Sequence, residues 1–260
     1  IYTYWHTLSL HDALPIFSGY LITEVLYERD DSYFSFIKRR YNKIFPPLIA
    51  VLTFSYLAFY YFYDYISLKL IYSSLSSLFG VSNLYQIFTG MSYFERSGDL
   101  FPLLHTWSLS IEIQFYILFP FLIYLFKKLK LDTEIIVAIV ILLSFISAGV
   151  MLYKEYINYD ISAIYYGTDT RIFSIFMGSA FYFLFKDRDL ENEKQKLNII
   201  SYICLCVIVV ITLSVYYLSK SNYYGFLFLI SILGSFITVT SLKTGFLDFY
   251  NPVANTLAKL

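Results

Sequence analysis

The chain has 260 residues, of which 58% are hydrophobic, 22% aromatic and only 15% charged. Soluble domains carry roughly 45–50% apolar and about 25% charged residues, so this composition indicates a membrane protein. The 19 basic and 19 acidic residues cancel, and no run of Lys or Arg is long enough to follow a phosphate backbone, which argues against a nucleic-acid partner.

The first sixteen residues differ from the rest of the chain. They contain neither an apolar run that could cross a membrane nor the basic start and apolar core of a signal peptide. The string TLSLHDALPI resembles translated sequencing-adaptor sequence. We therefore expect residues 1–16 to be a non-native segment and the native N-terminus to be missing, and we assign no role to His6 or His11.

Apolar runs in the remainder predict a series of helices. FSGYLITEVLY, from Phe17 to Tyr27, has the pattern of the second half of an apolar helix. A polar, basic segment follows and ends at Pro46-Pro47, and an apolar aromatic run then continues to about Tyr65. Further spans are predicted over 105–126, 132–153, 171–185, 197–218 and 223–242, and a last one that begins near Tyr250 and is cut off at Leu260.

The segment 68–88 is only moderately apolar and rich in serine, and it contains Asn83 and Gln86. Cytoplasmic loops of membrane proteins carry an excess of basic residues. If 68–88 does not cross, thirteen basic residues fall on the cytoplasmic side and five on the other; if it crosses, the outer side receives Lys127, Lys128 and Lys130. We therefore expect a re-entrant or partly embedded segment, with His105 near the outer face and the basic residues of 38–43 near the inner face.

The predicted fold is an all-α, polytopic transmembrane helical bundle that forms one domain over residues 17–260. The sequence contains no internal repeat, low-complexity stretch or linker. Cys204 and Cys206 lie two residues apart in an apolar run and would face different sides of a helix. Their spacing favours core packing over a disulfide or a metal site.

A stripe of polar residues lies in FPLLHTWSLSIEIQFYILFP, residues 101–120, which is otherwise apolar enough to enter a membrane. His105, Ser108 and Glu112 follow one another at intervals of three and four residues, so on one helix they share a face. A carboxylate at this depth is costly and indicates a polar cavity. A base beside a hydroxyl or carboxylate suits acyl transfer to a hydroxyl, and the alternative is a network that only holds helices together. Nearby lie Trp107, Gln114 and Tyr116.

A basic cluster occurs in FSFIKRRYNKIFPP, residues 34–47, just before a predicted span. Such clusters commonly fix membrane topology or contact anionic lipid. The alternative is a phosphate site, because Arg39, Arg40 and Lys43 fall within about one helical turn. The spacing alone does not decide between these two interpretations.

A third motif is YYGTDTRIF, residues 165–173, which opens a further predicted helix. Thr168 or Asp169 can cap this helix. Arg171 then stands at the start of a span on the outer side, where it can clamp an anionic or polyhydroxyl group or extend to the membrane surface. Both interpretations of Arg171 stay open.

Together these pieces resemble acyltransferase family 3, the membrane O-acyltransferases that modify bacterial surface polysaccharides, peptidoglycan and related glycans. LLHTWSLSIEIQFYILFP is close to the family's LLHTWSLxvEeqFYllwP signature. FSGYLIT is similar to its vlSGFLIT, and KRRYNKIFPP to its RRxxRIxP. SNLY at 82–85 and YYGTDTRIFSIFMGSAF at 165–181 also match its pattern. The resemblance covers essentially residues 17–260.

The resemblance implies transfer of an acyl group, often acetyl, from a cytoplasmic acyl-CoA such as acetyl-CoA to a sugar hydroxyl on the far side of the bacterial cytoplasmic (inner) membrane. The expected partners are the donor, a glycan or lipid-linked sugar (lipopolysaccharide included), and the lipid bilayer, with no metal. By this analogy the donor's phosphates would face Arg39, Arg40 and Lys43. The catalytic lining of the transfer cavity would comprise His105, Ser108 and Glu112. Substrate contacts would come from Trp107 and Arg171.

The chain departs from the family pattern in two places. Lys43 stands where the family has Arg, which keeps the charge but loses the bidentate fork. The family's first helix carries an Arg and a His taken as the catalytic base, and here the adaptor-like string stands in its place. We therefore expect a fragment truncated at both ends, inactive by itself, with about eight apolar helices of a roughly ten-helix domain. The alternatives are a flippase or transporter of a lipid-linked sugar, which inverted repeats would favour, and a non-catalytic membrane partner.

Overall fold

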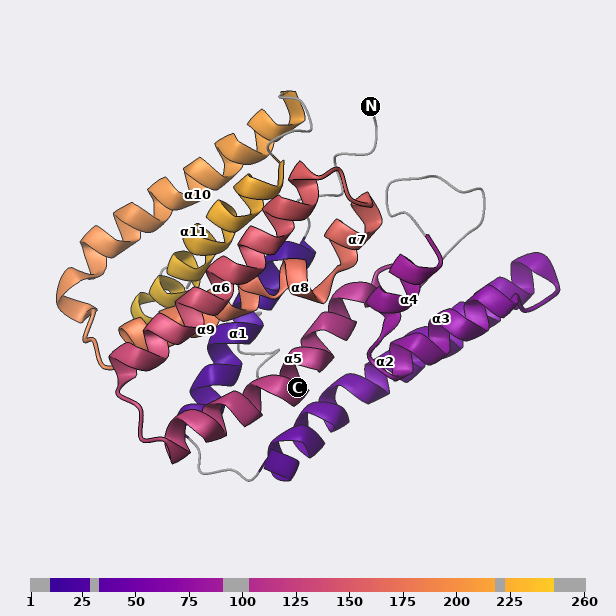
Figure 1. Cartoon of the computed structure of the whole chain (residues 1–260), viewed down its shortest axis with the longest axis horizontal. Coiled ribbons are helices and arrows are strands. Elements are labelled where there is room, and N and C mark those ends of the chain that lie inside the picture. The colour runs from indigo at the N-terminus through magenta and orange to yellow at the C-terminus, as the bar shows by residue number, and fades with distance from the viewer. Residues whose placement is uncertain (1–9, 29–32, 91–102, 218–222, 246–260) are drawn as a thin grey trace. The chain divides into compact units, whose positions relative to one another are not determined.

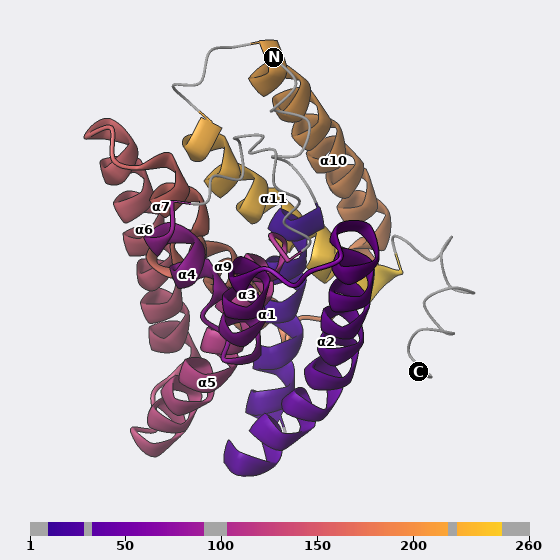
Figure 2. The same cartoon turned by 90° about the vertical axis from the view of Figure 1, so that its right-hand side faces the viewer.

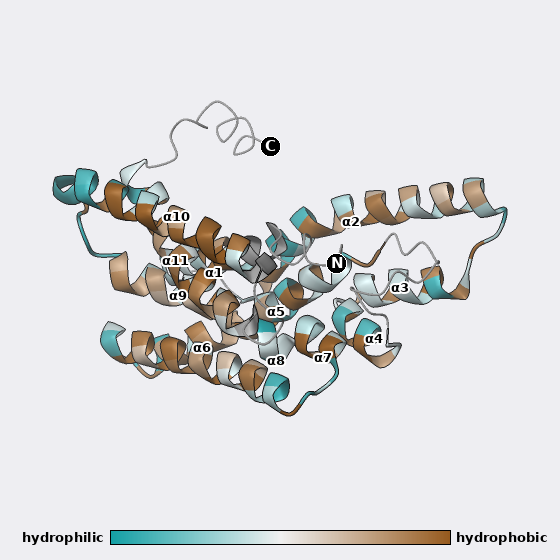
Figure 3. Ribbon diagram, turned by 90° about the horizontal axis from the view of Figure 1, so that it is seen from above, coloured by the Kyte–Doolittle hydropathy of each residue, from teal (hydrophilic) through white to brown (hydrophobic). Residues whose placement is uncertain are grey.

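The computed structural model describes residues 10–28, 33–90, 103–217 and 223–245 (Figure 1). These residues form helices joined by turns, and no β-strand occurs among them, which confirms the predicted all-α class. Colouring by hydropathy shows α6 and α10 hydrophobic along most of their lengths (Figure 3). The chain is a multi-pass helical membrane protein, because five helices of the described part are long and apolar enough to cross a membrane: α2 (Tyr33–Tyr63), α5 (Thr106–Lys128), α6 (Thr133–Tyr156), α10 (Lys194–Tyr217) and α11 (Tyr223–Thr244).

The other described α-helices are α1 (Leu10–Glu28), α3 (Leu68–Leu78), α4 (Ser82–Phe88), α7 (Ile161–Tyr166), α8 (Thr168–Arg171) and α9 (Phe173–Phe185). The spans predicted over 132–153, 197–218 and 223–242 agree with α6, α10 and α11 to within a few residues at each end. The span predicted from Tyr250 lies outside the described residues.

The predicted boundary at Pro46-Pro47 is wrong, because α2 runs through both prolines as one helix of 31 residues. Each proline removes a backbone N–H and so costs one helical hydrogen bond. In an apolar environment every other backbone group still needs a partner, and continuing the helix supplies one. A single helix therefore carries both the basic cluster and the apolar run that follows it.

The helix predicted over 171–185 is also interrupted, since α8 ends at Arg171 and α9 begins only at Phe173. The predicted cap by Thr168 or Asp169 is wrong, because Gly167 occupies the N-cap position and α8 has no side-chain cap hydrogen bond. A Cβ on residue 167 would lie 2.6 Å from the carbonyl oxygen of Ala163 and 2.6 Å from Oδ1 of Asp169. Glycine fits this tight junction, and the side chains of Thr168 and Asp169 face neighbouring helices.

The segment 68–88 forms two short helices, α3 and α4, that follow each other in the chain (Figure 2). Gly80 separates them with φ = +67°, a conformation that residues with a Cβ rarely adopt. Neither helix approaches the ~20 residues that a membrane crossing needs. This arrangement agrees with the predicted re-entrant or partly embedded segment, and the membrane orientation itself stays a prediction.

The helices pack into two compact units. Of the described residues, unit 1 contains 10–23, 137–141, 174–217 and 223–245, and unit 2 contains 24–28, 33–90, 103–136 and 142–173. Within unit 1, α1 and α9 approach so closely that a Cβ on Gly19 would collide with the carbonyl of Ile175, and one on Gly178 with the carbonyl of Ile16. Small residues permit this kind of helix contact in membranes. Unit 1 also pairs α10 with α11, through a 2.7 Å hydrogen bond between the hydroxyls of Ser201 and Thr240.

Unit 2 places the start of α2 beside the middle of α5. The hydroxyl of Tyr33 donates a 3.1 Å hydrogen bond to the carbonyl of Ile117. Further along α2, Leu48 and Leu52 join Leu70 of α3 in an apolar cluster against which Leu109 of α5 packs. The two helices are therefore antiparallel, and the basic residues of 38–43 lie beside the first half of α5.

Candidate functional site

Hydroxyl and amide groups of unit 2 fix the first turns of α5 against α3 and α4. Ser77 of α3 donates a 2.8 Å hydrogen bond to Oγ1 of Thr106. The backbone N–H of Ser82 donates to Oγ of Ser110 at 3.0 Å. Most side chains of α5 are apolar, so these few polar contacts set the rotation of the helix.

Glu112 of α5 has two partners among the predicted site residues and their neighbours. The hydroxyl of Tyr116 donates a 2.9 Å hydrogen bond to Oε2 of Glu112, one turn earlier on the same helix. The guanidinium of Arg40 lies 5.6 Å from the centre of the Tyr116 ring and interacts electrostatically with Glu112. The same guanidinium lies 5.4 Å from the centre of the Phe36 ring. A carboxylate, a phenol and a guanidinium thus meet between α2 and α5.

The structure divides the predicted phosphate-binding cluster. Arg40 is half-buried and turned toward α5. Arg39 donates a 2.8 Å hydrogen bond to Oγ of Ser35 on its own helix. Lys43 is exposed. Of the three, Arg40 therefore lies against α5 and is grouped with the predicted catalytic residue Glu112.

His105 lies in the turn just before α5 rather than in its first turn, and it is exposed. Ser108 is half-buried, and its hydroxyl contacts the carbonyl of His105 at 3.3 Å. Glu112 lies two turns after His105, about 10 Å further along the helix axis. His105 is therefore exposed at the start of α5, whereas Ser108 and Glu112 are half-buried within the helix.

Trp107 and Arg171, the two predicted substrate contacts, meet inside unit 2. Both side chains are buried, with Arg171 only 6% exposed. The guanidinium of Arg171 lies 4.5 Å from the ring centre of Tyr165 and 5.8 Å from that of Trp107. Its Nε donates a 2.9 Å hydrogen bond to the carbonyl of Tyr165. The alternative in which Arg171 extends to the membrane surface is therefore wrong, because aromatic rings and a carbonyl hold the cation in the protein interior.

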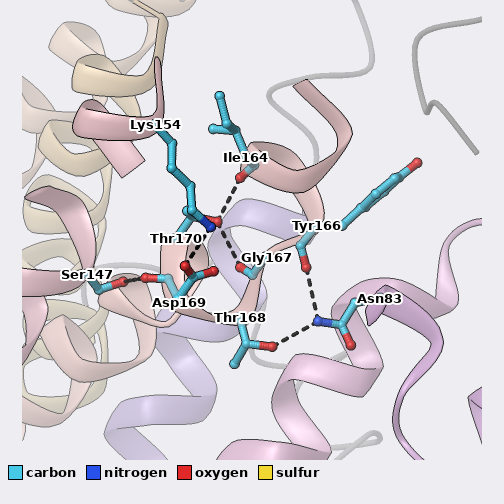
Figure 4. Close-up of polar contacts among 9 residues, drawn as sticks. All are labelled: Asn83, Ser147, Lys154, Ile164, Tyr166, Gly167, Thr168, Asp169 and Thr170. Atoms are coloured by element: carbon cyan, nitrogen blue, oxygen red, sulfur yellow. Dashed lines mark hydrogen bonds and ion pairs between the residues drawn. The ribbon is translucent and has the colours of Figure 1, made fainter. Parts of the chain in front are cut away.

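Sequence reasoning assigned no site role to a second group of polar residues, Asn83, Gln114 and Thr168, and interpreted Thr168 only as a possible helix cap. Nδ2 of Asn83 donates to Oγ1 of Thr168 at 2.8 Å and to the carbonyl of Tyr166 at 3.0 Å (Figure 4). Thr168 donates to Oε1 of Gln114 at 2.6 Å, and Nε2 of Gln114 donates to Oδ1 of Asn83 at 3.0 Å. The sequence feature that could have indicated this group is an amide side chain in each of two predicted membrane segments.

Asp169 ties the same loop to α6. Nζ of Lys154 forms a 2.6 Å ion pair with Oδ2 of Asp169, and Oγ of Ser147 donates a 2.7 Å hydrogen bond to its backbone carbonyl (Figure 4). Thr170 turns back on the loop and donates to the carbonyls of Ile164 and Gly167. The segment 165–171 is therefore held to α4 and α5 through Thr168 and to α6 through Asp169.

This constellation suits the binding of a polar substrate within an apolar bundle. Glu112 can accept a hydrogen bond from a hydroxyl and exposed Lys43 can meet phosphates, whereas Arg171 and Trp107 are buried against each other. Among the described residues, no three His, Cys, Asp or Glu side chains are grouped as metal ligands would be. Cys204 and Cys206 are not joined by a disulfide.

Comparison with known proteins identifies relatives of this chain. A family model described as an acyltransferase domain, that of acyltransferase family 3, matches residues 15–247. The peptidoglycan O-acetyltransferase OatA of Listeria monocytogenes is 34% identical over 178 residues, which are 66% of this chain and 29% of that protein. The O-acetyltransferase OatA of Staphylococcus aureus is 33% identical over 182 residues, again 66% of this chain and 29% of that protein.

The aligned region spans less than a third of the length of these relatives. No solved structure matches the chain. The family match, by contrast, runs through both packing units and includes every predicted site residue. The chain belongs to acyltransferase family 3.

Proposed function

We propose that this chain is the membrane part of a bacterial O-acyltransferase that moves an acetyl group from acyl-CoA to a hydroxyl of cell-wall carbohydrate. Family membership supports the reaction class, and a relative named as a peptidoglycan O-acetyltransferase supports the acceptor. The main structural support is the hydrogen bond from Tyr116 to Glu112, with Arg40 against the Tyr116 ring, on a helix that can span a membrane. The membrane is the bacterial cytoplasmic membrane.

The proposed chemistry needs one proton acceptor and one leaving group. The acceptor hydroxyl oxygen attacks the thioester carbonyl carbon, the C–S bond breaks, and CoA leaves as a thiolate that is then protonated. The hydroxyl proton passes to a base, which the family resemblance places on a further helix. Glu112 accepts a hydrogen bond from the same hydroxyl and orients it, and Tyr116 keeps that carboxylate in place.

In this proposal Arg40 has one role, and Lys43 and Arg39 have another. Arg40 stabilises the charge of Glu112 in a low-dielectric setting, where an unpaired carboxylate is costly. Lys43, exposed on the same helix, meets the donor's phosphates, and Arg39 adjoins it. Lys43 and Arg39 thus fit an anionic donor, although Arg40, the third member of the basic cluster, does not bind the donor.

The outer half of α5 serves the acceptor. In this proposal the acceptor meets half-buried Ser108 and exposed His105, which adjoin at the start of α5. Trp107 and Arg171 form the wall that holds the carbohydrate. A lipid-linked sugar is an acceptor of the same chemistry as the polymeric glycan.

Labelled acetyl-CoA supplied to membranes that contain the intact protein tests this function. We expect label to appear in carbohydrate as an alkali-labile ester, at a rate that depends on the protein. A flippase or transporter of a lipid-linked sugar would leave the label on CoA while the sugar changes sides. Protein-dependent translocation without ester formation would overturn the proposal.

A further inference from the structure

Asn83, Gln114 and Thr168 form a closed ring of three hydrogen bonds between α4, α5 and α8. Asn83 donates to Thr168 at 2.8 Å, Thr168 donates to Gln114 at 2.6 Å, and Gln114 donates back to Asn83 at 3.0 Å. Asn83 is 0% exposed. A buried polar network whose members satisfy one another is rigid and specific, because removal of one member leaves a hydrogen-bonding group of its neighbours unsatisfied.

Two further hydrogen bonds attach the ring to the backbone. The second donor of Asn83 goes to the carbonyl of Tyr166 at 3.0 Å, and Gln114 also donates to the carbonyl of Gly80 at 2.8 Å. Gly80 is the break between α3 and α4, and Tyr166 is the end of α7. The ring therefore fixes two helix junctions of unit 2, the one between α3 and α4 and the one between α7 and α8, to one position on α5.

The ring also determines where Arg171 lies. Thr168 begins the four-residue helix α8, and Arg171 ends it. Trp107 precedes Gln114 by seven residues, so both lie on one face of α5, about 10 Å apart along its axis. The segment 165–171 hence meets α5 at two points: the Thr168–Gln114 hydrogen bond and the contact of Arg171 with Trp107.

We propose that Asn83, Gln114 and Thr168 are positioning residues that set the register of the segment 165–171 against α5 and thereby hold Arg171 over Trp107. Asp169 and Thr170 make this segment stiff, because Lys154, Ser147 and the loop carbonyls hold it (Figure 4). Loss of the ring then moves the segment as a body and carries Arg171 with it. The catalytic consequence rests on the proposed function, whereas the structural one does not.

Tryptophan fluorescence tests the structural part directly. The chain has two tryptophans, and a Trp5→Phe background leaves only Trp107. We expect Thr168→Val, which removes the hydroxyl and keeps the shape, to shift the Trp107 emission maximum. Thr168→Ser keeps the hydroxyl and should retain the parental spectrum. Thr53→Val is the matched control, because Thr53 is exposed and its hydroxyl bonds only within α2.

The spectra decide the proposal without any assay of acyl transfer. An unchanged Trp107 emission in Thr168→Val would overturn it, and so would an equal shift in Thr168→Ser. If Thr168→Val fails to accumulate in membranes, Gln114→Glu serves in its place. It retains the acceptor for Thr168 and loses the donor to Asn83, and the same spectral shift is expected.

The catalytic part is tested in the intact enzyme by a double-mutant cycle. Thr168→Val should lower kcat/KM for the acceptor by about 10- to 100-fold, as a displaced binding group does, and leave the KM for acyl-CoA unchanged. In an Arg171→Lys background, Thr168→Val should add little, because both changes disturb one contact. Fully additive losses would contradict action through Arg171. An enzyme with no transferase activity would refute the proposed function while the fluorescence result still stands.

Discussion

The hydroxyl of Tyr116 donates a 2.9 Å hydrogen bond to the carboxylate of Glu112, and Arg40 of α2 lies against the Tyr116 ring. This relationship joins two motifs that are about 70 residues apart in the sequence. It gives the basic cluster and the α5 motif one common site. A carboxylate in a span-length helix is costly to bury, so we expect this one to serve a function.

Tyr116→Phe tests the hydrogen bond without disturbing the aromatic contact with Arg40. A hydrogen bond to a charged group contributes about 1.5–3 kcal/mol, so its loss should lower kcat by roughly 10- to 100-fold if it holds Glu112 in the reactive position. The control is Tyr124→Phe, an exposed tyrosine on the same helix. Equal rates for Tyr116→Phe and the parent enzyme would exclude this role.

Arg40 and Lys43 should respond differently to neutralisation. Lys43→Gln removes an exposed charge and should raise the KM for acyl-CoA with kcat nearly unchanged, because it affects donor binding alone. Arg40→Gln leaves Glu112 without its cation and should lower kcat. Steady-state kinetics with varied acyl-CoA distinguishes the two variants. An identical rise in the KM for acyl-CoA from both would show that the cluster is a single phosphate site.

His105→Ala should abolish acyl transfer while the protein still inserts in the membrane. His105 is exposed at the start of α5, so its side chain contributes little packing. Gln195→Ala, at the exposed start of α10, is the control. Ester formation and membrane yield are measured together. Retained activity in His105→Ala would remove this histidine from the site.

Gly167→Ala and Gly149→Ala form a matched pair for stability. A Cβ at residue 167 would press on the carbonyl of Ala163 at 2.6 Å and on Oγ1 of Thr170 at 2.7 Å, whereas one at residue 149 would meet nothing within 4 Å. Gly167→Ala should therefore lower the thermal midpoint in detergent. Gly149→Ala, within α6, should leave it unchanged or raise stability by about 0.4–1 kcal/mol. A reversed order of the two midpoints would contradict the described geometry around α8.

Much of the helical framework follows from the sequence, because apolar run length decides which helices can cross a membrane. The α5 motif also places Ser108 and Glu112 on one face by spacing alone. The two errors in helix boundaries have local causes. Pro46-Pro47 predicts a break that an apolar environment suppresses, and the helix predicted over 171–185 is interrupted at Ile172, between the end of α8 and the start of α9.

Contacts between distant segments could not be predicted in this way. Nothing in the spacing of Arg39, Arg40 and Lys43 shows which of them faces α5, since that depends on how α2 is rotated against its neighbour. Thr168 was interpreted as a helix cap because Thr commonly caps helices. Its hydroxyl instead satisfies Gln114, an amide of another span that needs a buried partner.

Glu112→Gln in the intact enzyme is the most direct test of the central claim, with Glu134→Gln, an exposed acid in the first turn of α6, as the control. The measurement is the initial rate at which label passes from acetyl-CoA to cell-wall carbohydrate, at equal amounts of membrane-inserted protein. We predict that Glu112→Gln abolishes this transfer and that Glu134→Gln leaves it unchanged. Transfer at the parental rate by Glu112→Gln would contradict the assignment of this carboxylate to the site.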